Sequence, residues 1–410
     1  MHIDRFSQWA IESLNILNIL VLHRFPIDIV VGTNPSFPAM VEYLSKKAHR
    51  IVFMSFKGGA ENKLGSAELM ELKWDFKRGD PFDKVLKTFL WIVLVPWIVT
   101  GTVKKQDIDL IYCDDSIPLY PFVVKKLVGG RAKVIMRLGD LQSGYLFADQ
   151  GFLKDMLFNF FHSLEVFMWK TMDGIICLSY PFKKFLEQKK VPSEKIFVVK
   201  ESIDVDFFHK KNSDIRRRYN VPEDKVLIMF HGAIEKCKGI EVLIEAAEKL
   251  FMRNDRIYFM IVGDGSSLKQ IKRSVEKRCL KDRFIFTGWI PFEQMPDYVN
   301  AADMGIALRS VNMANHFVVT TALLQYWACQ KPLLVPSLEA IKEVVVDGEN
   351  AVVFEVGNSI DLMEKIEHML EIEDKWPSIG KAGRKVAERL FEKEKIGSEI
   401  ANVITDLALS

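Results

Sequence analysis

The chain has 410 residues, which is too long for one typical hydrophobic core and predicts two domains. A hydrophobic content of 49% fits packed α/β domains and excludes a disordered chain. The net charge of +2 is uneven, because residues 1–200 carry 27 Lys or Arg against 21 Asp or Glu. Either the first half meets an anionic partner such as a lipid surface, or these lysines are ordinary solvated ones. No nucleic-acid partner is expected.

Cysteine usage and the start of the chain bear on the compartment. The five cysteines are scattered and form no CxxC pair, which indicates a reducing compartment and no zinc site. Residues 1–13, MHIDRFSQWAIES, have acidic and polar residues where a secretory signal has its apolar core. We expect a cytoplasmic protein, with peripheral contact to the inner face of the membrane as one option.

From residue 27 onward, strand-like apolar runs alternate with helical segments. Residues 1–26 precede the first expected strand and are expected to form an extension. In the first half, strands are expected at 27–33, 49–56, 109–115, 133–140, 173–179 and 195–202, with helices at 38–48, 83–103, 118–127, 152–171 and 181–190. This alternation predicts a parallel sheet covered by helices on both faces.

Residues 204–220 are polar and irregular and are expected to connect two domains. The alternation then restarts, with strands expected at 225–232, 257–265, 283–289, 304–310, 332–337 and 350–356. The expected fold class is α/β with two doubly wound, Rossmann-like domains, 1–203 and 204–388, and a helix at 389–410 that packs back on the first. Such domains bind ligands at the carboxyl ends of their strands, and two that face each other bind across the cleft between them.

Residues 231–250, HGAIEKCKGIEVLIEAAEKL, combine a glycine-rich loop with a strongly patterned helix. A helix N-terminus offers unpaired N–H groups and partial positive charge. Gly232 and Gly239 let a ligand approach the backbone, and Lys236 or Lys238 adds full charge. The segment predicts either a phosphate or diphosphate site, or an ordinary loop with solvated lysines.

A specific order of motifs follows this loop. G(x5)KG before a helix is followed by IVGDG, FTGWIP, NAADMGIAL, YWACQKPLLVP and EVVVDGENAVVFEVGNSIDL. This order resembles glycosyltransferase family 4, retaining enzymes of the GT-B fold, over residues 195–390 and less closely over 27–195. The resemblance implies transfer of a sugar from a nucleotide-diphosphate sugar, with the donor as substrate and no further cofactor.

The resemblance also implies a donor site in the second domain. Its matched positions are Gly232, Lys238, Gly239, Gly263, Gly288, Ile290 and Gln325, with Lys236 as a further donor-binding candidate. Lys238 matches the lysine on the donor diphosphate, and Gly263 lies with Asp264 at the turn after the second strand. The loop of Gly288 and Ile290 matches the one that reads the nucleobase, and Gln325 takes the place of the acidic residue that binds the ribose.

The chain departs from the family at several of these places. Ala233 replaces an arginine, and Lys236 is expected to compensate for its charge. The acids of the family's E-x7-E element are replaced by Phe317 and Gln325, and the lysine of a K-x-x-E variant is replaced by Ala322. Gln330 replaces a glycine. Glutamine still hydrogen-bonds ribose hydroxyls, and loss of the charged bond is expected to weaken donor binding by about 1–2 kcal/mol.

Two residues of the first domain are candidates for the reacting end of the site. Asp140 matches the family's HD-type element, although Gly139 replaces the histidine, and it either acts on an acceptor hydroxyl or only caps the following helix. Arg137 on the same strand either contacts a phosphate or is a surface arginine. The pair Asp114–Asp115 is the only near match to a DxD metal motif, and a strand-ending turn is the favoured interpretation, so metal-independent transfer is expected.

The roles of two basic residues of the second domain have more than one interpretation. His231 either meets the donor or is a satisfied histidine at the end of a strand. Arg309 follows an expected strand and is a candidate phosphate ligand if it points toward the cleft.

Two apolar stretches raise the question of a membrane. Residues 89–103 are shorter than a bilayer-spanning helix and are interrupted by Pro96, and residues 13–22 are shorter still, so neither is expected to span. Trp91 and Trp97 suit either a membrane interface or a buried helix. A further helically spaced set is expected to pack in the core, with lipid contact as the lesser option: Leu157, Phe160, Phe161, Leu164, Phe167 and Met168.

Two functions fit the sequence. The first is a retaining, metal-independent glycosyltransferase of the hexosyltransferase type, with Lys238 and Asp140 as catalytic residues and a sugar or lipid-linked acceptor. The second is a degenerate GT-B protein that binds a ligand or partner without turnover, a reading motivated by Ala233, Phe317 and Gln325.

Overall fold

The structure is a computed structural model that divides the chain into two compact units. It describes residues 16–25, 34–47, 49–57, 64–65, 67–75, 81–146 and 152–410, without the side chains of 74–75, 81–84, 145–146 and 152–155. The first unit comprises residues 1–200 and 393–410, and the second comprises residues 201–392. The C-terminal segment thus returns to the first unit.

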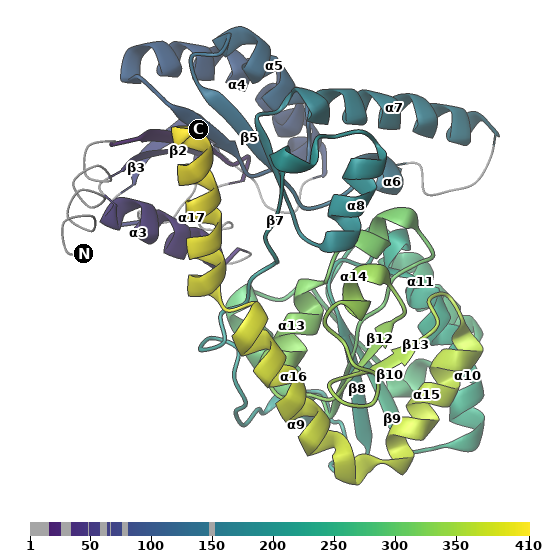
Figure 1. The fold of residues 1–410 in the computed structure, drawn as a ribbon. Helices are drawn as coiled ribbons and strands as arrows, with labels where there is room; N and C mark the ends of the chain where they lie inside the picture. Colours follow the sequence, from purple (N-terminus) through teal and green to yellow (C-terminus); the bar gives the residue numbers. More distant parts are fainter. Residues whose placement is uncertain are drawn as a thin grey trace. The chain divides into compact units, whose positions relative to one another are not determined.

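The first unit is built on a seven-stranded parallel sheet with the order β3-β2-β1-β4-β5-β6-β7 (Figure 1). Its strands are β1 (Asn18–Leu22), β2 (Arg50–Lys57), β3 (Glu68–Asp75), β4 (Leu110–Cys113), β5 (Lys133–Leu138), β6 (Gly174–Cys177) and β7 (Ile196–Val198). Strands β2 and β3 lie on one side of β1, and strands β4 to β7 lie on the other, so the strand order reverses at β1. The doubly wound class expected from the alternation is confirmed in this unit.

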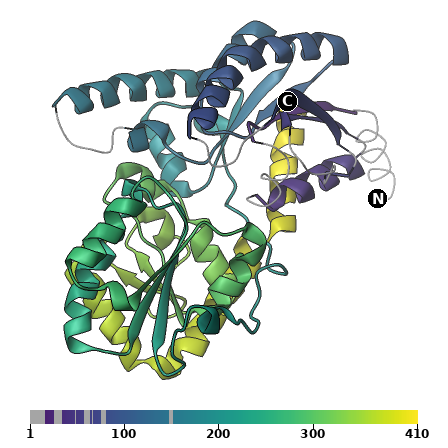
Figure 2. The same cartoon turned by 180° about the vertical axis from the view of Figure 1, so that it is seen from behind.

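Helices cover both faces of this sheet. They are α3 (Ser36–Lys46), α4 (Pro81–Gln106), α5 (Leu119–Val128), α6 (Gln142–Leu146), α7 (Phe152–Thr171), α8 (Tyr180–Gln188) and the C-terminal α17 (Lys393–Leu409). α17 packs against α3, as Figures 1 and 2 both show. A Cβ at Gly397 of α17 would lie 2.7 Å from the backbone nitrogen of Met40, so glycine permits this close packing.

The start of the first unit differs from the expectation. Strand β1 lies inside residues 1–26, which were expected to be an extension, and it occupies the middle of the sheet. Its run of five apolar or amide residues is too short for periodicity to separate a strand from a helix segment. The strand expected at 27–33 lies outside the described residues. Strand β3 was missed, because the charged residues of ELMELKWD interrupt its apolar residues, so it has neither a continuous apolar run nor strict alternation.

Helix α4 is longer than its apolar run indicates. It has 26 residues and continues through Pro96. The expectation that this helix is too short to span a bilayer and is interrupted at Pro96 was therefore wrong. By length and composition alone, Val85–Gln106 is long and apolar enough to cross a membrane, with a mean hydropathy of 1.7. One of its faces belongs to the core, since Trp91, Val95 and Val99 are fully buried.

The second unit has a six-stranded parallel sheet with the order β10-β9-β8-β11-β12-β13. Its strands are β8 (Val226–His231), β9 (Ile257–Val262), β10 (Phe284–Gly288), β11 (Met304–Ile306), β12 (Leu333–Pro336) and β13 (Val352–Phe354). All six lie within the strands expected from the sequence. β8 is completely buried, as expected for a central strand of a parallel sheet.

Two helical layers cover this sheet. On one face lie α10 (Ile240–Arg253), α11 (Leu268–Lys277) and α15 (Ser359–Glu371). On the other lie α12 (Met295–Ala301), α13 (Thr321–Ala328) and α16 (Trp376–Leu390). Two further short helices are α9 (Ile215–Arg218) and α14 (Glu339–Lys342).

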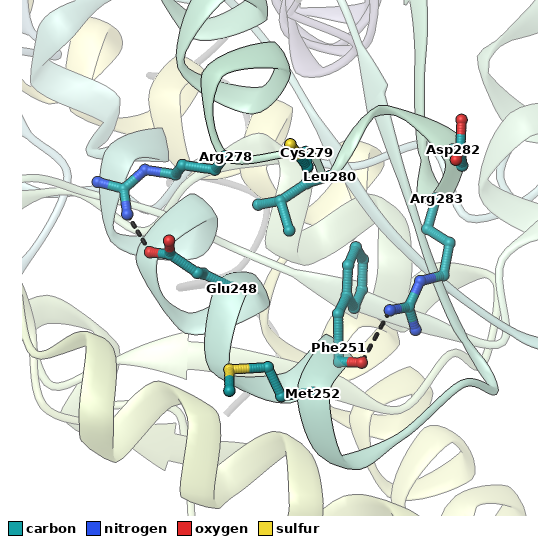
Figure 3. Close-up of a pocket in the computed structure, with 8 residues that line it drawn as sticks. All are labelled: Glu248, Phe251, Met252, Arg278, Cys279, Leu280, Asp282 and Arg283. Atoms are coloured by element: carbon teal, nitrogen blue, oxygen red, sulfur yellow. Dashed lines mark hydrogen bonds and ion pairs between the residues drawn. The ribbon is translucent and has the colours of Figure 1, made fainter.

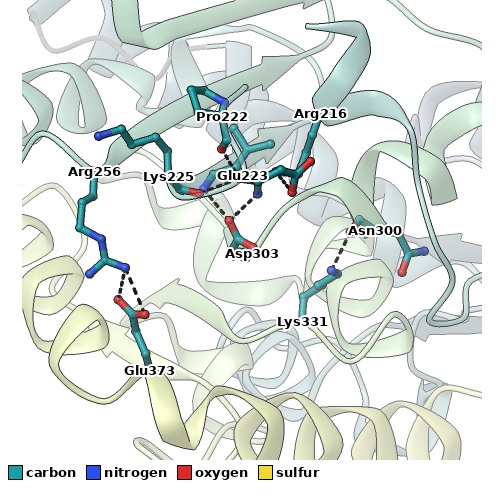
Figure 4. Close-up of polar contacts among 10 residues, drawn as sticks. Arg216, Pro222, Glu223, Lys225, Arg256, Asn300, Asp303, Lys331 and Glu373 are labelled. Carbon is teal, nitrogen blue, oxygen red and sulfur yellow. Dashed lines mark hydrogen bonds and ion pairs between the residues drawn. The ribbon is translucent and has the colours of Figure 1, made fainter. Parts of the chain in front are cut away.

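The expected connection, residues 204–220, is fixed to the second unit by polar contacts (Figure 4). Arg216 of α9 donates to Asp303 Oδ2 at 2.6 Å and to the carbonyl oxygens of Pro222 and Lys225 at 2.9 and 2.6 Å. The same Asp303 oxygen accepts from the backbone N–H of Leu227 at 2.8 Å. Arg216 therefore ties the connection to the first residues of β8 and β11.

We expect Arg216→Ala to lower the free energy of unfolding of the second unit by about 2–3 kcal/mol, because it removes the charged donor of Asp303 and a donor to each of two carbonyls. Arg217→Ala, an exposed neighbour on the same helix, is the matched control and should change stability by less than about 0.5 kcal/mol. Urea unfolding of both variants measures the difference. Equal losses of stability in the two variants would mean that the contacts of Arg216 do not stabilise the second unit.

Candidate functional site

The candidate site of the second unit lies at the carboxyl edge of its sheet. The strand order reverses direction between β8 and β11, which is where open α/β sheets bind ligands. His231 ends β8, Gly263 follows β9 directly and Gly288 ends β10. The topology therefore gathers several of the sequence-predicted donor residues at one edge.

The loops after β8 and β9 cross at two glycines. Gly263 has φ +136°, and a Cβ on it would lie 2.0 Å from the carbonyl oxygen of Gly232. Gly232 itself has φ +138°. The backbone N–H of Gly263 donates to the carbonyl of Gly288 at 2.9 Å, which adds the end of β10 to the same crossing. Only glycine fits at this contact, since any side chain at 263 overlaps the backbone of the first loop.

Further contacts hold the loop after β8 in place. The backbone N–H of Ile234 donates to the carbonyl of Asp264 at 2.9 Å, and that of Ser267 donates to the carbonyl of Ile234 at 3.0 Å. Glu235 accepts from both the backbone N–H and the hydroxyl of Ser266. The loop is thus a fixed structure, although no pattern in the sequence indicated Glu235 or Ser266.

Gly239 lies where the loop meets the segment after β11. It has φ +68°, and a Cβ on it would come within 3.0 Å of the Arg309 carbonyl and the Ser310 nitrogen. Ser310 donates to the carbonyl of Cys237 through both its backbone N–H and its hydroxyl, each at 3.0 Å. Arg309 is half-buried beside this junction. The two loops on either side of the switch point are therefore joined.

The lysines of the loop precede helix α10 as expected. Lys236 and Lys238 lie in a single 3₁₀ turn, Gly239 is the N-cap, and α10 begins at Ile240. Lys236 is exposed and Lys238 is half-buried. Two cationic side chains thus lie immediately before the positive end of a 14-residue helix, an arrangement that favours an anion.

His231 is buried at the end of β8, next to this loop. Its ring lies 4.9 Å from that of Tyr326, centroid to centroid, and Tyr326 donates to the carbonyl of Met229 at 2.5 Å. Burial lowers the pKa of His231 to about 4, so the ring is neutral at pH 7. Its Nε2 atom has no hydrogen-bond partner among the residues that the structure describes, so the ring is not fully satisfied by these residues.

Gln325 is buried in helix α13, one residue before Tyr326. Its Oε1 atom is buried without a hydrogen-bond partner in the described part of the chain. A buried amide oxygen without a donor costs free energy and is available to a ligand hydroxyl. Phe317, at the other position of the replaced acidic element, is buried and apolar.

The loop after β10 carries the remaining predicted donor residues. Gly288 has φ +71°, and no atom lies within 4 Å of a Cβ placed on it. Ile290 is buried, whereas Trp289 between them is exposed. The open space at Gly288 leaves the backbone accessible to a planar group.

The first unit has its own polar cluster at the carboxyl edge of β4 and β5. Arg137 of β5 is buried and forms an ion pair with Asp114 at 3.5 Å, which excludes the surface arginine considered from the sequence. Asn34 donates to the other oxygen of Asp114 at 3.2 Å and accepts from Ser36 at 2.7 Å. The cluster lies next to the reversal of strand order between β1 and β4.

A second ion pair lies beside the first. Arg24, just after β1, contacts Asp115 at 3.3 Å and donates to Thr88 at 2.9 Å. Burial raises the pKa of Asp115, and Arg24 opposes this shift. Asp115 also accepts from the backbone N–H of Ile117, which is the turn favoured from the sequence. Arg24 was missed because β1 was not recognised as a strand.

Asp140 follows β5 at the same edge. Its backbone N–H and that of Gly139 both donate to the hydroxyl of Ser116 at 3.0 Å, which fixes the turn after β5 to the turn after β4. Its side chain is half-buried. The predicted pair Arg137 and Asp140 is thus brought to one edge, together with Asp114, Asp115 and Arg24.

Within the described residues, no group of three His, Cys, Asp or Glu side chains is placed to hold a metal ion.

One cavity of the second unit lies away from the carboxyl edge of its sheet. A cavity of about 420 Å³ lies near the C-terminal ends of α10 and α11 (Figure 3), where Arg283 stacks on Phe251 at 3.5 Å. Both helices end there before β9 and β10 begin, so this cavity lies at the opposite, amino edge of the sheet.

We expect Gly263→Ala to lower the free energy of unfolding by at least about 3 kcal/mol, since it combines a strained φ with overlap of the backbone at Gly232. Gly348→Ala is the matched control, because Gly348 has φ +77° but no atom within 4 Å of an added Cβ, and it should cost about 1 kcal/mol. Denaturant unfolding separates them. Equal losses would show that φ alone matters.

His231 should make the stability of the second unit depend on pH. Between pH 6.5 and 4 the unfolded chain binds a proton at this histidine and the folded chain does not, so the free energy of unfolding falls by up to about 3 kcal/mol as the pH is lowered. Above pH 6.5 both states are neutral and the contribution is constant. His231→Gln should flatten this slope in urea unfolding at pH 7 and 4.5, and an unchanged slope would contradict the assignment.

Comparison with known proteins shows similarity to glycosyltransferases. Residues 211–386 match the family of glycosyl transferases group 1. N-acetyl-α-D-glucosaminyl L-malate synthase of Bacillus anthracis is 20% identical over 307 residues, which cover 74% of this chain and 76% of that protein. Lipopolysaccharide 1,2-N-acetylglucosaminetransferase of Salmonella typhimurium is 26% identical over 185 residues, 43% of this chain and 47% of that protein.

Solved structures agree over nearly the whole chain. Anabaena HepE, crystallised with UDP and glucose, has a TM-score of 0.72 at 16% identity and covers 95% of this chain and 99% of its own. A glycosyltransferase of Rickettsia africae has a TM-score of 0.69 at 16% identity and covers 96% of this chain and 99% of its own. These findings confirm the fold class and the resemblance to glycosyltransferases, while membership of family 4 stays a prediction. Residues 211–386 therefore resemble the group 1 glycosyl transferases, and the chain as a whole has the GT-B fold.

Proposed function

We propose that this protein transfers a glycosyl group from a nucleotide-diphosphate sugar to a hydroxyl acceptor, with retention of anomeric configuration and without a metal ion. One observation carries the proposal. The loop of Gly232–Gly239 is fixed by the glycine crossing at Gly263 and ends in two lysines before helix α10. That loop lies within the segment that matches the glycosyl transferases.

The chemistry suits this loop. An acceptor oxygen bonds to the anomeric carbon while the bond from that carbon to the β-phosphate oxygen breaks. The electron pair leaves with the nucleoside diphosphate, so negative charge grows where Lys238, Lys236 and the first amides of α10 lie. The acceptor proton passes to the departing phosphate or to a carboxylate, for which Asp140 is the candidate.

The proposal of metal-independent transfer rests on the same residues. Fixed cations and helix-end N–H groups stabilise a departing diphosphate as a divalent metal does in other sites. Asp114 and Asp115, the nearest match to a metal motif, are each held by an arginine instead. Retention is inherited from the resemblance to family 4.

The acceptor is proposed to bind at the carboxyl edge of the first unit. Arg137 and Arg24 supply buried positive charge there, although each is balanced by an aspartate. A lipid-linked sugar or phosphate is the proposed acceptor class, at the cytoplasmic face of a membrane. The lipopolysaccharide transferase among the relatives and the excess of lysine in the first half support this choice.

A degenerate, non-catalytic protein is the second candidate. Its support is the replacement of the family's acidic pair by the buried Phe317 and by Gln325, whose Oε1 atom has no partner among the described residues. Hydrolysis of a panel of nucleotide sugars distinguishes the two functions. Binding without hydrolysis or transfer of any donor would favour the second candidate.

We expect Lys238→Ala to weaken binding of UDP, the nucleotide held by the HepE crystals, by at least about tenfold, because a charged hydrogen bond contributes roughly 1.5–3 kcal/mol. Lys249→Ala, an exposed lysine at the far end of α10, is the matched control and should bind as the wild type does. Calorimetric titration measures both. Unchanged affinity of the Lys238 variant would remove the donor site.

The same titration tests the ribose assignment. Gln325→Glu should strengthen UDP binding, because a carboxylate accepts a stronger hydrogen bond from a ribose hydroxyl than an amide oxygen does. Equal or weaker binding, with the fold retained, would contradict the contact at Gln325 while leaving that at Lys238 intact.

A further inference from the structure

Helix α7 turns much of its apolar surface outward. The exposed fractions of Phe160 and Phe167 are 59% and 55%, and Met156, Phe161 and Leu164 are also exposed. The spacing of Met156, Phe160, Leu164 and Phe167 places them on one side of the helix. The expectation that this set packs in the core was therefore wrong for most of its members.

Two polar side chains of α7 lie on its inner face together with a tryptophan. His162, Glu165 and Trp169 are buried. The backbone N–H of Ser143 donates to Glu165 at 3.2 Å, and the Ser143 hydroxyl lies 3.3 Å from His162 Nδ1. These contacts fix the rotation of α7 about its axis, so the outward phenylalanines are a consequence of specific packing.

Helix α4 carries a second apolar face. Val85, Phe89, Val93 and Trp97 recur every four residues and are exposed, with fractions of 61% at Phe89 and 66% at Trp97. The opposite face is fixed in the core, because the fully buried Trp91 ring lies 5.3 Å from Phe56 and 6.0 Å from Tyr120.

The two helices are neighbours of α5 in the first unit. α5 packs against both α4 and α7 (Figure 1). The rings of Phe122 and Phe167 lie 5.6 Å apart. The ammonium of Lys126 lies over the Phe122 ring at 5.6 Å. A lysine therefore adjoins the aromatic side chains where α5 meets α7.

The exposed charges among the described side chains of these helices are positive. Among the described side chains of α4, α5 and α7, the only carboxylate is that of Glu165, and it is buried. Exposed lysines end both apolar faces, with Lys104 and Lys105 after Trp97 and Lys170 after Phe167. Apolar and aromatic side chains bordered by lysines match the acyl boundary and the negative headgroups of an anionic bilayer.

We propose that the outer faces of α4 and α7 dock this protein on an anionic lipid surface. The apolar face is defined as Val85, Phe89, Val93 and Trp97 of α4 with Met156, Phe160, Leu164 and Phe167 of α7. Docking is interfacial, since spanning would require α4 to leave the core that holds Trp91. The absence of exposed carboxylates from these described side chains favours lipid over a second copy of the chain, whose surfaces carry both signs of charge.

This inference deepens the membrane-side acceptor proposed above but is tested separately from it. Flotation with vesicles of phosphatidylcholine and phosphatidylglycerol, and with phosphatidylcholine alone, measures docking. Two double variants test the helices separately. The α7 variant carries Phe160→Glu with Phe167→Glu, and the α4 variant carries Phe89→Glu with Trp97→Glu. Met252→Glu with Ile360→Glu, both exposed apolar residues of the second unit, is the matched control.

The wild type should float with the anionic vesicles and less with the neutral ones, and added salt should weaken the binding. Each helix variant should lower the bound fraction about tenfold, while the control floats as the wild type does. UDP binding retained by every variant shows that the fold and donor site are intact, so loss of flotation alone concerns docking alone.

Three results would overturn the proposal. The first is a wild type that does not float. The second is equal flotation of the wild type and both helix variants. The third is a helix substitution that converts a dimer to a monomer in size-exclusion chromatography and leaves flotation unchanged, which would assign the face to a second copy.

Discussion

The backbone crossing of Gly263 and Gly232 is the constraint on which the donor site depends. A Cβ at Gly263 would lie 2.0 Å from the Gly232 carbonyl oxygen, so the loops after β8 and β9 meet without any side chain between them. The crossing fixes the first residues of the loop, and Gly239 fixes its last residue against the segment after β11. Lys236 and Lys238 are placed between these two fixed points. Backbone packing therefore sets where the chain carries these two lysines before α10.

Most of the second unit could be predicted from its sequence because its signals are local. The apolar runs that became β8 to β13 are bounded by glycine or polar residues, and the loop at 231–239 contains the glycines that its φ angles require. The order of motifs added the family, which no single motif shows. What the sequence did not reveal are the contacts between loops, such as Glu235 with Ser266, because those pairings depend on which strands are neighbours.

The first unit was predicted less well, for two physical reasons. Strand β1 is short and follows other apolar residues, so its pattern did not distinguish it from a helix segment, and Arg24 was not recognised at its end. Helix α7 was assigned the wrong inner face, since hydrophobic spacing shows which residues share a side but not which side is buried. The buried His162 and Glu165 decide that, and their partner Ser143 lies on another helix.

Specific polar contacts therefore select one arrangement of each unit, which the apolar cores alone do not. The apolar core favours any arrangement that removes carbon from water, whereas a hydrogen bond between named atoms favours one arrangement. Arg216 with Asp303 fixes the entry into the second sheet, and Arg24 with Asp115 fixes the turn between two strands of the first. In α7, polar contacts also determine which face of the helix is buried. By holding polar residues inside, Ser143 and its partners leave the phenylalanines outside, where they are available to a surface other than the protein's own core.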